Sequence, residues 1–588
     1  MQSLDPGFGM GGSATGGVRA SELPRARQES PEMYPIVPCA DGFVRICVLA
    51  PRQWQGMFNW MGKPEEFADP KYNNLFARFA SPTLRPAIAR LFADKTRTVL
   101  EEEGQRHGVP TAALLSLEEA VASEHFRERG VFSQVPIAPG VDVTLPNGVY
   151  VIDGVRTTAR ATLPAAEPAD ARFASSAQSS TLTENTGGRP LAGLRVLDFG
   201  VIVVGAEQGR LLADYGAEVI KVENTAFPDG ARQTMERGAK ISAGFVSGNR
   251  NKKSLGLNLR SERGRELLLQ LARQSDIVLS NFKPGTLESL GLGNDVLLAA
   301  NPRLILVDSS AFGSTGPWST RMGYGPLVRA SVGLSSLWRY ADDPSAFHDR
   351  TTIYPDHVAA RVGVAGILAL LARRLRTGRG GTLSVAQAEV VLDHLAPQIA
   401  AAELARSGIA IEGSAQPAPW GVFPCAGEDE WCAVTVRDDA DWQRLCRAIE
   451  RPDLAADASL ATTPQRVTQR ARVDAALTDW LRERTPVEAM ETLQSAGIPA
   501  GAMLRSWELL DFAPCRERRT FSTMQQNHMP EPLHVESRSV LAEHFADPVF
   551  NSAPLLGEHT REIARDLLGL SAADTEQLIA AGVFEVPA

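Results

Sequence analysis

The segment LRVLDFGVIVVGAEQGRLLADYGAEVIKVE, residues 194–223, decides the fold class. It begins with a short apolar strand, continues as a helix that Gly216 ends, and closes with a second strand. The same alternation continues in a helix at 261–274 and strands at 276–279 and 304–307. Because strands that alternate with helices are typical of parallel sheets, we predict an α/β fold for residues 190–405.

The composition fits an ordinary globular protein and disfavours several function classes. Of 588 residues, 44% are hydrophobic and 22% charged, and the formal net charge is −9, which disfavours a surface for nucleic acid. No apolar run has the roughly 18 residues of a membrane span, and the first residues lack a secretion signal. The six cysteines show no metal-site spacing. We therefore predict a cytoplasmic protein with no metal, membrane or nucleic-acid partner.

A module of about 130 residues occurs twice. YPIVPC at 34–39 resembles WGVFPC at 420–425, and HGVP at 107–110 resembles AGIP at 496–499. The two copies keep an offset of about 388 residues, and each is predicted to begin with a strand and continue with helices. The predicted order is a disordered Gly/Ser-rich leader (1–33), the first small domain (34–164), a flexible linker (165–189), the large domain (190–405) and the second small domain (406–550).

Two loops of the large domain carry side chains suited to a phosphorylated ligand. In an open parallel sheet, ligands bind at the carboxyl ends of the strands. NRNKKS at 249–254 combines three cations with two amides, which is typical of a phosphate site or of a solvated turn. NFKPG at 281–285 follows a strand and suits an adenine ring, a phosphate or an ordinary strand-to-helix turn.

Asp356 is the candidate catalytic residue. It lies in YPDH, residues 354–357, just before an apolar helix at 358–371. Aspartate at such a position is often an N-cap, which accepts the free N–H groups of the first turn. The positive end of the helix dipole would also keep the carboxylate ionised, so that it could act as a nucleophile without a general base. The sequence leaves both interpretations open.

Several motifs, in order along the chain, resemble the class III CoA-transferases of the CaiB/BaiF family. They are PLAGLRVLD (190–198), LLADYGAEVIKVE (211–223), NFKPG (281–285), NPRLI (301–305), TGRG (377–380) and LGEHT (556–560). The resemblance implies a Rossmann-like large domain, smaller α+β domains and interlocked dimers, with residues 551–588 returning to the large domain. It also implies a CoA-transferase that exchanges coenzyme A between an acyl-CoA donor and a carboxylic acid acceptor, with no metal or nucleotide cofactor.

The resemblance also implies the residues of the site. Asp356 matches the catalytic aspartate, which forms an aspartyl-CoA intermediate. The positions that contact CoA fall on Ile202, Val203, Asn224, Gly248, Asn249, Asn251, Asn281, Phe282, Lys283 and Tyr324. Lys252 is added because of its charge.

The chain departs from the family pattern at three places. Gly323-Tyr324-Gly325 stands where the family often has Gly-Tyr-Asp, Ile202-Val203-Val204 where polar residues are common, and 411–419 where a Gly-rich loop covers the site. Two small domains also accompany one large domain. We therefore expect either that the N-terminus is truncated or that a partner subunit supplies a second large domain, in a homodimer or a heteromer.

Two alternative functions share this fold. An acyl-CoA racemase or isomerase would pair a histidine with the aspartate for proton transfer at the α-carbon. A non-catalytic CoA-binding subunit would complete a heteromer. The sequence does not identify the donor or the acceptor acid.

Overall fold

The computed structural model describes nine stretches of the chain. They are residues 34–138, 140–158, 188–233, 239–339, 343, 345–347, 353–409, 416–538 and 546–587. The predicted leader and most of the predicted linker lie outside them. Contacts divide the chain into two units, one formed by the described residues of Pro31–Glu403 and Glu517–Ala588, the other by those of Leu404–Arg516. None of the helices in these ranges has both the length and the apolar character of a bilayer-spanning segment.

A nine-stranded sheet forms the centre of the first unit. Within the described residues its parallel strands run in the order β10 (Lys253–Leu257), β9 (Glu218–Glu223), β8 (Arg195–Asp198), β11 (Ile277–Ser280), β12 (Ile305–Asp308) and β13 (Gly381–Val385). The predicted parallel α/β sheet is thus confirmed. Numbered along the chain, this order is 3-2-1-4-5-6, which is the order of doubly wound nucleotide-binding sheets.

Antiparallel strands extend this sheet at both edges. β19 (Phe584–Glu585) pairs with β10, while β6 (Tyr150–Ile152) pairs with β13 and is followed by β7 (Val155–Arg156). Neither β13 nor these edge strands were predicted from the sequence. β6 and β7 come from the end of the first predicted small domain, so that segment is joined to the large sheet by main-chain hydrogen bonds.

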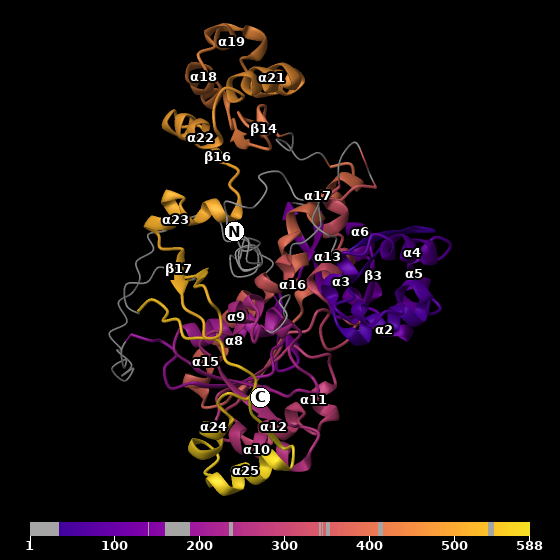
Figure 1. Cartoon of the computed structure of the whole chain (residues 1–588). Helices are drawn as coiled ribbons and strands as arrows, with labels where there is room; N and C mark the ends of the chain where they lie inside the picture. Colours follow the sequence, from indigo (N-terminus) through magenta and orange to yellow (C-terminus); the bar gives the residue numbers. More distant parts are fainter. Residues whose placement is uncertain are drawn as a thin grey trace. The chain divides into compact units, whose positions relative to one another are not determined.

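Helices cover both faces of the sheet, because its strands are apolar on both sides. In β8, Val196 belongs to one core and its neighbour Leu197 to the other. The first core contains α8 (Val204–Asp214) and α15 (Tyr354–Thr377), and the second contains α10 (Glu262–Ala272), α12 (Asn294–Ala300) and α24 (Thr560–Asp566). Figure 1 shows α10, α12 and α24 gathered with α25 (Ala572–Ala580), away from α8 and α15.

The repeated sequence corresponds to two sheets with the same strand order. The first contains β1 (Ile36–Cys39), β2 (Gly42–Ile46) and β3 (Thr111–Ala113), and the second β14 (Trp420–Pro424), β15 (Trp431–Thr435) and β16 (Ala500–Ala502). One face of each sheet packs on helices of its own module. These are α2 (Pro51–Trp60), α4 (Leu84–Phe92) and α5 (Arg97–His107) in the first copy, and α18 (Asp439–Ala448), α21 (Arg470–Leu481) and α22 (Pro486–Ser495) in the second.

The opposite faces of the two sheets have different surroundings. Tyr34 and Cys47 of the first module are buried against α13 (Gly325–Ser331) of the large domain, in one cluster with Leu327. In the second module, Trp420 and Val422 are 40% and 56% exposed. The first copy therefore belongs to the same unit as the large domain, whereas the second forms the core of the other unit.

The unit that contains the second module ends at Arg516, whereas the second small domain was predicted to extend to residue 550. The hairpin of β17 (Phe521–Met524) and β18 (Leu533–Glu536) packs on α9 (Ala243–Asn249) of the large domain. Phe245 of α9 lies in one buried cluster with Met524 and Val535 of the hairpin. This apolar contact explains why residues 517–538 belong to the first unit.

Buried charges also attach the hairpin to the large domain. Arg210 of α8 donates to Glu207 at 3.0 Å, to Asp214 at 3.1 Å and to Glu536 of β18 at 3.1 Å. Arg361 of α15 donates to Glu536 at 3.0 Å and also to Glu207. Because each buried carboxylate has a guanidinium partner, the charges fix the positions of α8, α15 and β18 relative to one another.

Lys252 connects the end of β8 to the turn before β10. Its ammonium donates to Asp198 at 2.7 Å, to the Ala206 carbonyl at 2.7 Å and to Asn249 at 2.9 Å, and its side chain is fully buried. Burial lowers the pKa of Lys252 to about 8, although the charge of Asp198 opposes this. An ammonium has three N–H donors, and all three are used here. This geometry argues against the predicted phosphate-binding role of Lys252 and assigns it a structural one.

Lys252→Met should therefore destabilise the protein. It leaves the Asp198 carboxylate buried without its cation, which should lower the free energy of unfolding by about 3 kcal/mol in urea titrations. The control is Lys253→Met, because Lys253 is a third exposed and pairs with Glu218 and Glu562 near the surface. That change should cost under about 1 kcal/mol. A Lys252→Met protein with normal stability but weak affinity for coenzyme A would contradict the structural role.

Candidate active site

Asp356 lies in the first turn of α15, a helix of 24 residues. The N-cap of this helix is Ile353, and no side chain makes a capping hydrogen bond. The interpretation of Asp356 as an N-cap is therefore wrong. Its carboxylate stands at the positive end of the helix dipole and is only 7% exposed.

The carboxylate of Asp356 is buried with one oxygen unsatisfied. Within the described part of the chain, Oδ2 has no hydrogen-bond partner. Burial raises the pKa of Asp356 to about 6, although the nearby charges of His357 and Arg329 lower it. A buried, unpaired carboxylate oxygen is costly, and such groups are found preferentially at functional sites.

Gly325 allows this carboxylate to occupy its position. A Cβ atom built on Gly325 would lie 2.0 Å from Oδ2 of Asp356. Any side chain at 325 would therefore collide with the carboxylate. The departure from Gly-Tyr-Asp to Gly-Tyr-Gly thus has a steric reason in this chain.

His357 is bonded to Glu207 on α8. Its Nδ1 lies 2.7 Å from Oε2 of Glu207, and both side chains are buried. Burial alone would raise the pKa of Glu207, but the charges of His357, Arg361 and Arg210 hold it at about 2. The imidazole therefore holds α15 against α8.

The loops after β8 and β11 meet where the strand order of the sheet reverses. Oδ1 of Asn281 accepts from the Val201 N–H at 2.8 Å, and its Nδ2 donates to the Val201 carbonyl at 3.0 Å. In doubly wound sheets, this reversal point opens the crevice in which ligands bind. The predicted site residues Asn281, Ile202 and Val203 thus lie in two loops that meet at this reversal point.

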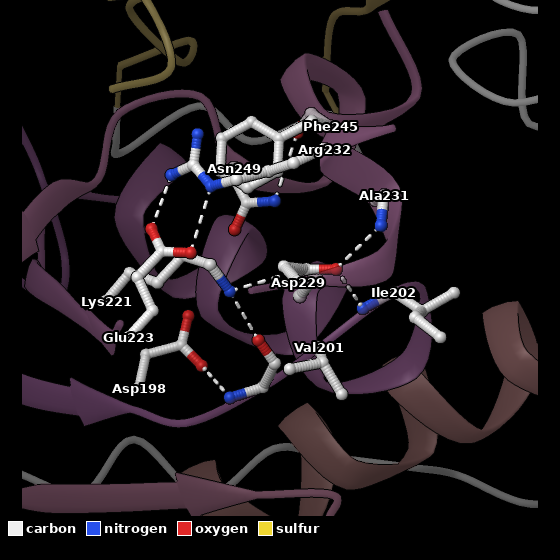
Figure 2. Close-up of polar contacts among 12 residues, drawn as sticks. Asp198, Val201, Ile202, Lys221, Glu223, Asp229, Ala231, Arg232, Phe245 and Asn249 are labelled. Atoms are coloured by element: carbon white, nitrogen blue, oxygen red, sulfur yellow. Dashed lines mark hydrogen bonds and ion pairs between the residues drawn. The ribbon is translucent and has the colours of Figure 1, made fainter. Parts of the chain in front are cut away.

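The backbone of Ile202 has an unusual conformation. Its φ angle is 60°, a left-handed region that β-branched residues rarely occupy. The carboxylate of Asp229 accepts from the Ile202 N–H at 2.9 Å, and Lys221 donates to both Asp229 (2.9 Å) and the Gly200 carbonyl (2.6 Å) (Figure 2). Such a strained turn persists only where surrounding contacts determine it, and it is a feature of ligand-binding loops.

The buried pair of Lys221 and Asp229 is ionised. Burial alone would lower the pKa of Lys221, but the charges of Asp229 and Glu223 raise it. Burial alone would raise the pKa of Asp229, but Lys221 and the backbone N–H groups of Ala231 and Ile202 lower it. The loop that carries Ile202 and Val203 is therefore fixed by a charged pair.

The predicted residues of the α9–β10 turn mainly bond within the protein. Nδ2 of Asn249 donates to the Phe245 carbonyl at 3.0 Å. Nδ2 of Asn251 donates to Asp214, and its Oδ1 accepts from the Asn551 N–H, both at 2.7 Å. A Cβ on Gly248 would lie 3.0 Å from that of Ala206. These residues shape the turn, and the contacts do not direct their amides to a ligand.

The remaining candidates at the carboxyl edge are more accessible. Lys283 is exposed, and Phe282 is half-buried with its ring 6.2 Å from that of Phe199. Asn224, after β9, is half-buried and accepts from the Phe227 N–H at 3.0 Å. These residues offer a cation, an aromatic face and an amide at the edge where the sheet binds ligands.

The first small module covers the other side of the site. Val203 and Ile202 lie in one apolar cluster with Tyr34 and Cys47 of this module. Tyr324 is the N-cap residue of α13, and its hydroxyl accepts from Nε2 of Gln53 at 2.8 Å. This cover explains the apolar residues at 202 and 203, whereas Val204 packs in the core that contains α8 and α15. The sequence did not indicate Tyr34 or Gln53, and only the repeat pointed to their module.

Comparisons with known proteins indicate the family to which this chain belongs. The model of CoA-transferase family III matches residues 6–168 and 191–560, so it includes the first module as well as the large domain. The probable CoA-transferase Rv1866 of Mycobacterium tuberculosis is 43% identical in an alignment 595 residues long, which covers all of this chain and 75% of the relative. The succinyl-CoA–D-citramalate CoA-transferase of Chloroflexus aurantiacus is 33% identical and covers 67% of this chain and 98% of the relative.

Solved structures show the same similarity. The crystal structure of Rv3272 from M. tuberculosis has a TM-score of 0.56 at 30% identity and covers 64% of this chain and 99% of its own. A CAIB/BAIF family protein from Brucella suis has a TM-score of 0.56 at 27% identity, with coverages of 65% and 100%. The chain therefore belongs to CoA-transferase family III and is a CoA-transferase.

Proposed function

We propose that this CoA-transferase exchanges coenzyme A between carboxylic acids through a covalent intermediate on Asp356. The observation that carries the proposal is the buried Asp356 carboxylate, whose Oδ2 has no hydrogen-bond partner within the described residues. Gly325 leaves space for that oxygen, and the helix dipole of α15 favours its ionised form. An ionised carboxylate with an oxygen that makes no hydrogen bond is suited to nucleophilic attack.

The reaction divides into four exchanges. Asp356 attacks the thioester carbonyl of the donor and the C–S bond breaks. The CoA thiolate departs, and a mixed anhydride of Asp356 and the donor acid remains. The thiolate attacks the aspartyl carbonyl, so that the donor acid departs as a carboxylate and an aspartyl-CoA thioester remains. The acceptor carboxylate displaces the thiolate to form a second anhydride. The thiolate then attacks the acceptor acyl carbon, which gives the new acyl-CoA and regenerates Asp356.

The site must exclude water during these steps, because hydrolysis of an anhydride would waste the donor thioester. The apolar cluster of Ile202 and Val203 with Tyr34 and Cys47 supports such exclusion. The predicted covering loop at 411–419 falls mostly outside the described residues. We propose that Ile202, Val203, Asn224, Asn281, Phe282, Lys283 and Tyr324 contact the CoA portion of the acyl-CoA substrate.

The relatives suggest donors and assemblies to examine. Their names include succinyl-CoA and formyl-CoA enzymes, and the Chloroflexus L-malate enzyme has α and β subunits. We propose an acyl-CoA donor and a carboxylic acid acceptor, and an assembly that is a homodimer or a heteromer. Light scattering of the purified chain tests the homodimer, and a mass of 63.3 kDa would exclude it.

Trapping with hydroxylamine tests the covalent intermediate. After mixing with succinyl-CoA or formyl-CoA, peptide mapping by mass spectrometry should locate a hydroxamate on Asp356, because hydroxylamine attacks anhydrides and thioesters. Asp356→Asn should give no adduct and no transfer. Asp308→Asn, which changes a half-buried carboxyl group whose pKa burial also raises, should retain both.

A different outcome would favour the alternative functions. Binding of CoA with no adduct from any donor would contradict the proposal. Solvent-deuterium exchange at the acyl α-carbon would then identify a racemase, and its absence a non-catalytic subunit. The bond between His357 and Glu207 supports the transferase over the racemase, because this imidazole is committed to α8.

The pH dependence of transfer should report the pKa of Asp356. Burial raises that pKa to about 6, and only the ionised form is nucleophilic. The rate should therefore be constant above pH 7 and fall about tenfold per pH unit well below 6. Burial also raises the pKa of Asp308 to about 7, so Asp308→Asn is the matched control and should keep the acid limb. A rate that stays constant down to pH 5 would contradict the assignment.

A further inference from the structure

The first module holds the segment of the large domain against which the nucleophile packs. Arg45 of β2 is fully buried and donates to the Pro326 carbonyl at 3.4 Å and to Ser335 at 3.3 Å. The Leu115 N–H donates to the Ala330 carbonyl at 3.0 Å. These contacts attach the module to α13, whose first residue, Gly325, lies against Asp356.

Gln53 adds a polar contact with a defined direction. Its Oε1 accepts from the N–H groups of Leu49 at 2.8 Å and Ala50 at 2.9 Å, so the oxygen side of the amide is fixed. The amide nitrogen must then face Tyr324, and it donates to the hydroxyl oxygen at 2.8 Å. Because that oxygen accepts from Gln53, the hydroxyl proton of Tyr324 is available to another acceptor.

Comparison with the second copy of the module distinguishes the acceptor role of the Gln53 amide from its donor role. Trp54 aligns with Trp442, so Gln53 aligns with Asp441 and Leu49 with Arg437. Asp441 is also fully buried, and its Oδ2 accepts from the Arg437 N–H at 3.0 Å. The acceptor role is therefore structural and common to both copies. A carboxylate has no N–H to donate, so the donor role belongs to the first copy, which faces Asp356.

Tyr324 is close to the nucleophile. It immediately precedes Gly325, whose Cα lies against Oδ2 of Asp356. Tyr324 packs in one apolar cluster with Ile353, the N-cap residue of the helix whose first turn carries Asp356, and burial raises the pKa of Tyr324. When Asp356 attacks a thioester, negative charge develops on the carbonyl oxygen, and a hydroxyl donor at that place would stabilise it.

We propose that Gln53 is a positioning residue that directs the Tyr324 hydroxyl proton to the thioester carbonyl oxygen of bound acyl-CoA. This inference rests on the proposed function of Asp356. The first module would then cover the site and also orient one of its hydrogen-bond donors. Gln53 itself touches no substrate and acts through Tyr324.

Gln53→Glu is the decisive substitution. The introduced carboxylate can still accept from the Leu49 and Ala50 N–H groups, as Asp441 accepts in the second copy. It reverses the contact with Tyr324, however, because the hydroxyl now donates its proton to this carboxylate and no longer to the substrate. We expect kcat to fall roughly 10- to 100-fold, with KM for acyl-CoA changed less than about threefold.

Tyr324→Phe completes a double-mutant cycle. It should lower kcat by a similar factor, and Gln53→Glu should have no further effect in that background, because the hydroxyl on which it acts is gone. The matched control is Gln55→Glu, since Gln55 lies on the same helix, is exposed and bonds to Asn73 at 2.9 Å. This control should keep wild-type kcat and KM.

The measurements separate failure of this inference from failure of the proposed function. A wild-type chain that forms no adduct on Asp356 contradicts the function. If the wild type is active and Gln53→Glu has an unchanged kcat, the inference is overturned. A change confined to KM also overturns it, because Tyr324 would then contribute only to binding of the CoA portion of the substrate. If Gln53→Glu does not fold, Tyr324→Phe still tests the hydroxyl through which Gln53 acts, and an unchanged kcat in that variant overturns the inference.

Discussion

The arrangement of the site depends on the contacts that the buried Glu207 carboxylate makes with neighbouring cations and with His357. This carboxylate is buried on α8 and binds Arg210 of its own helix together with His357 and Arg361 of α15. Successive residues of a helix point about 100° apart around its axis. Fixing His357 toward α8 therefore turns Asp356, one residue earlier, toward α13 and Gly325. The direction of the Asp356 carboxylate thus follows from a contact between His357 and Glu207 in which Asp356 takes no part.

The central sheet could be predicted because its physical cause is local. Apolar strands such as 194–199 and 276–279 are separated by amphipathic helices, and this alternation specifies a parallel sheet. β6 and β13 escaped prediction because they pair with each other across more than two hundred residues of chain. Their hydrogen bonds are long-range, and no periodicity within either segment indicates them.

The site was predictable in part, and the errors share one cause. The loops that carry Asn281 and Ile202 could be located because both follow predicted parallel strands, and the resemblance to the family indicated Ile202 itself. Lys252 was interpreted from its charge, but the acceptors that use all its protons, such as Asp198, come from other elements. Gln53 carries no motif, and its role follows from a contact with Tyr324 that only the folded chain makes.

Gly325 also limits how the site could be redesigned. The atom that a Cβ at 325 would strike is Oδ2 of Asp356, the end of a side chain, so a larger residue at 325 requires this carboxylate to turn away from its present direction. Positions 325 and 356 are therefore coupled: the size of the side chain that the first tolerates depends on the direction of the carboxylate at the second.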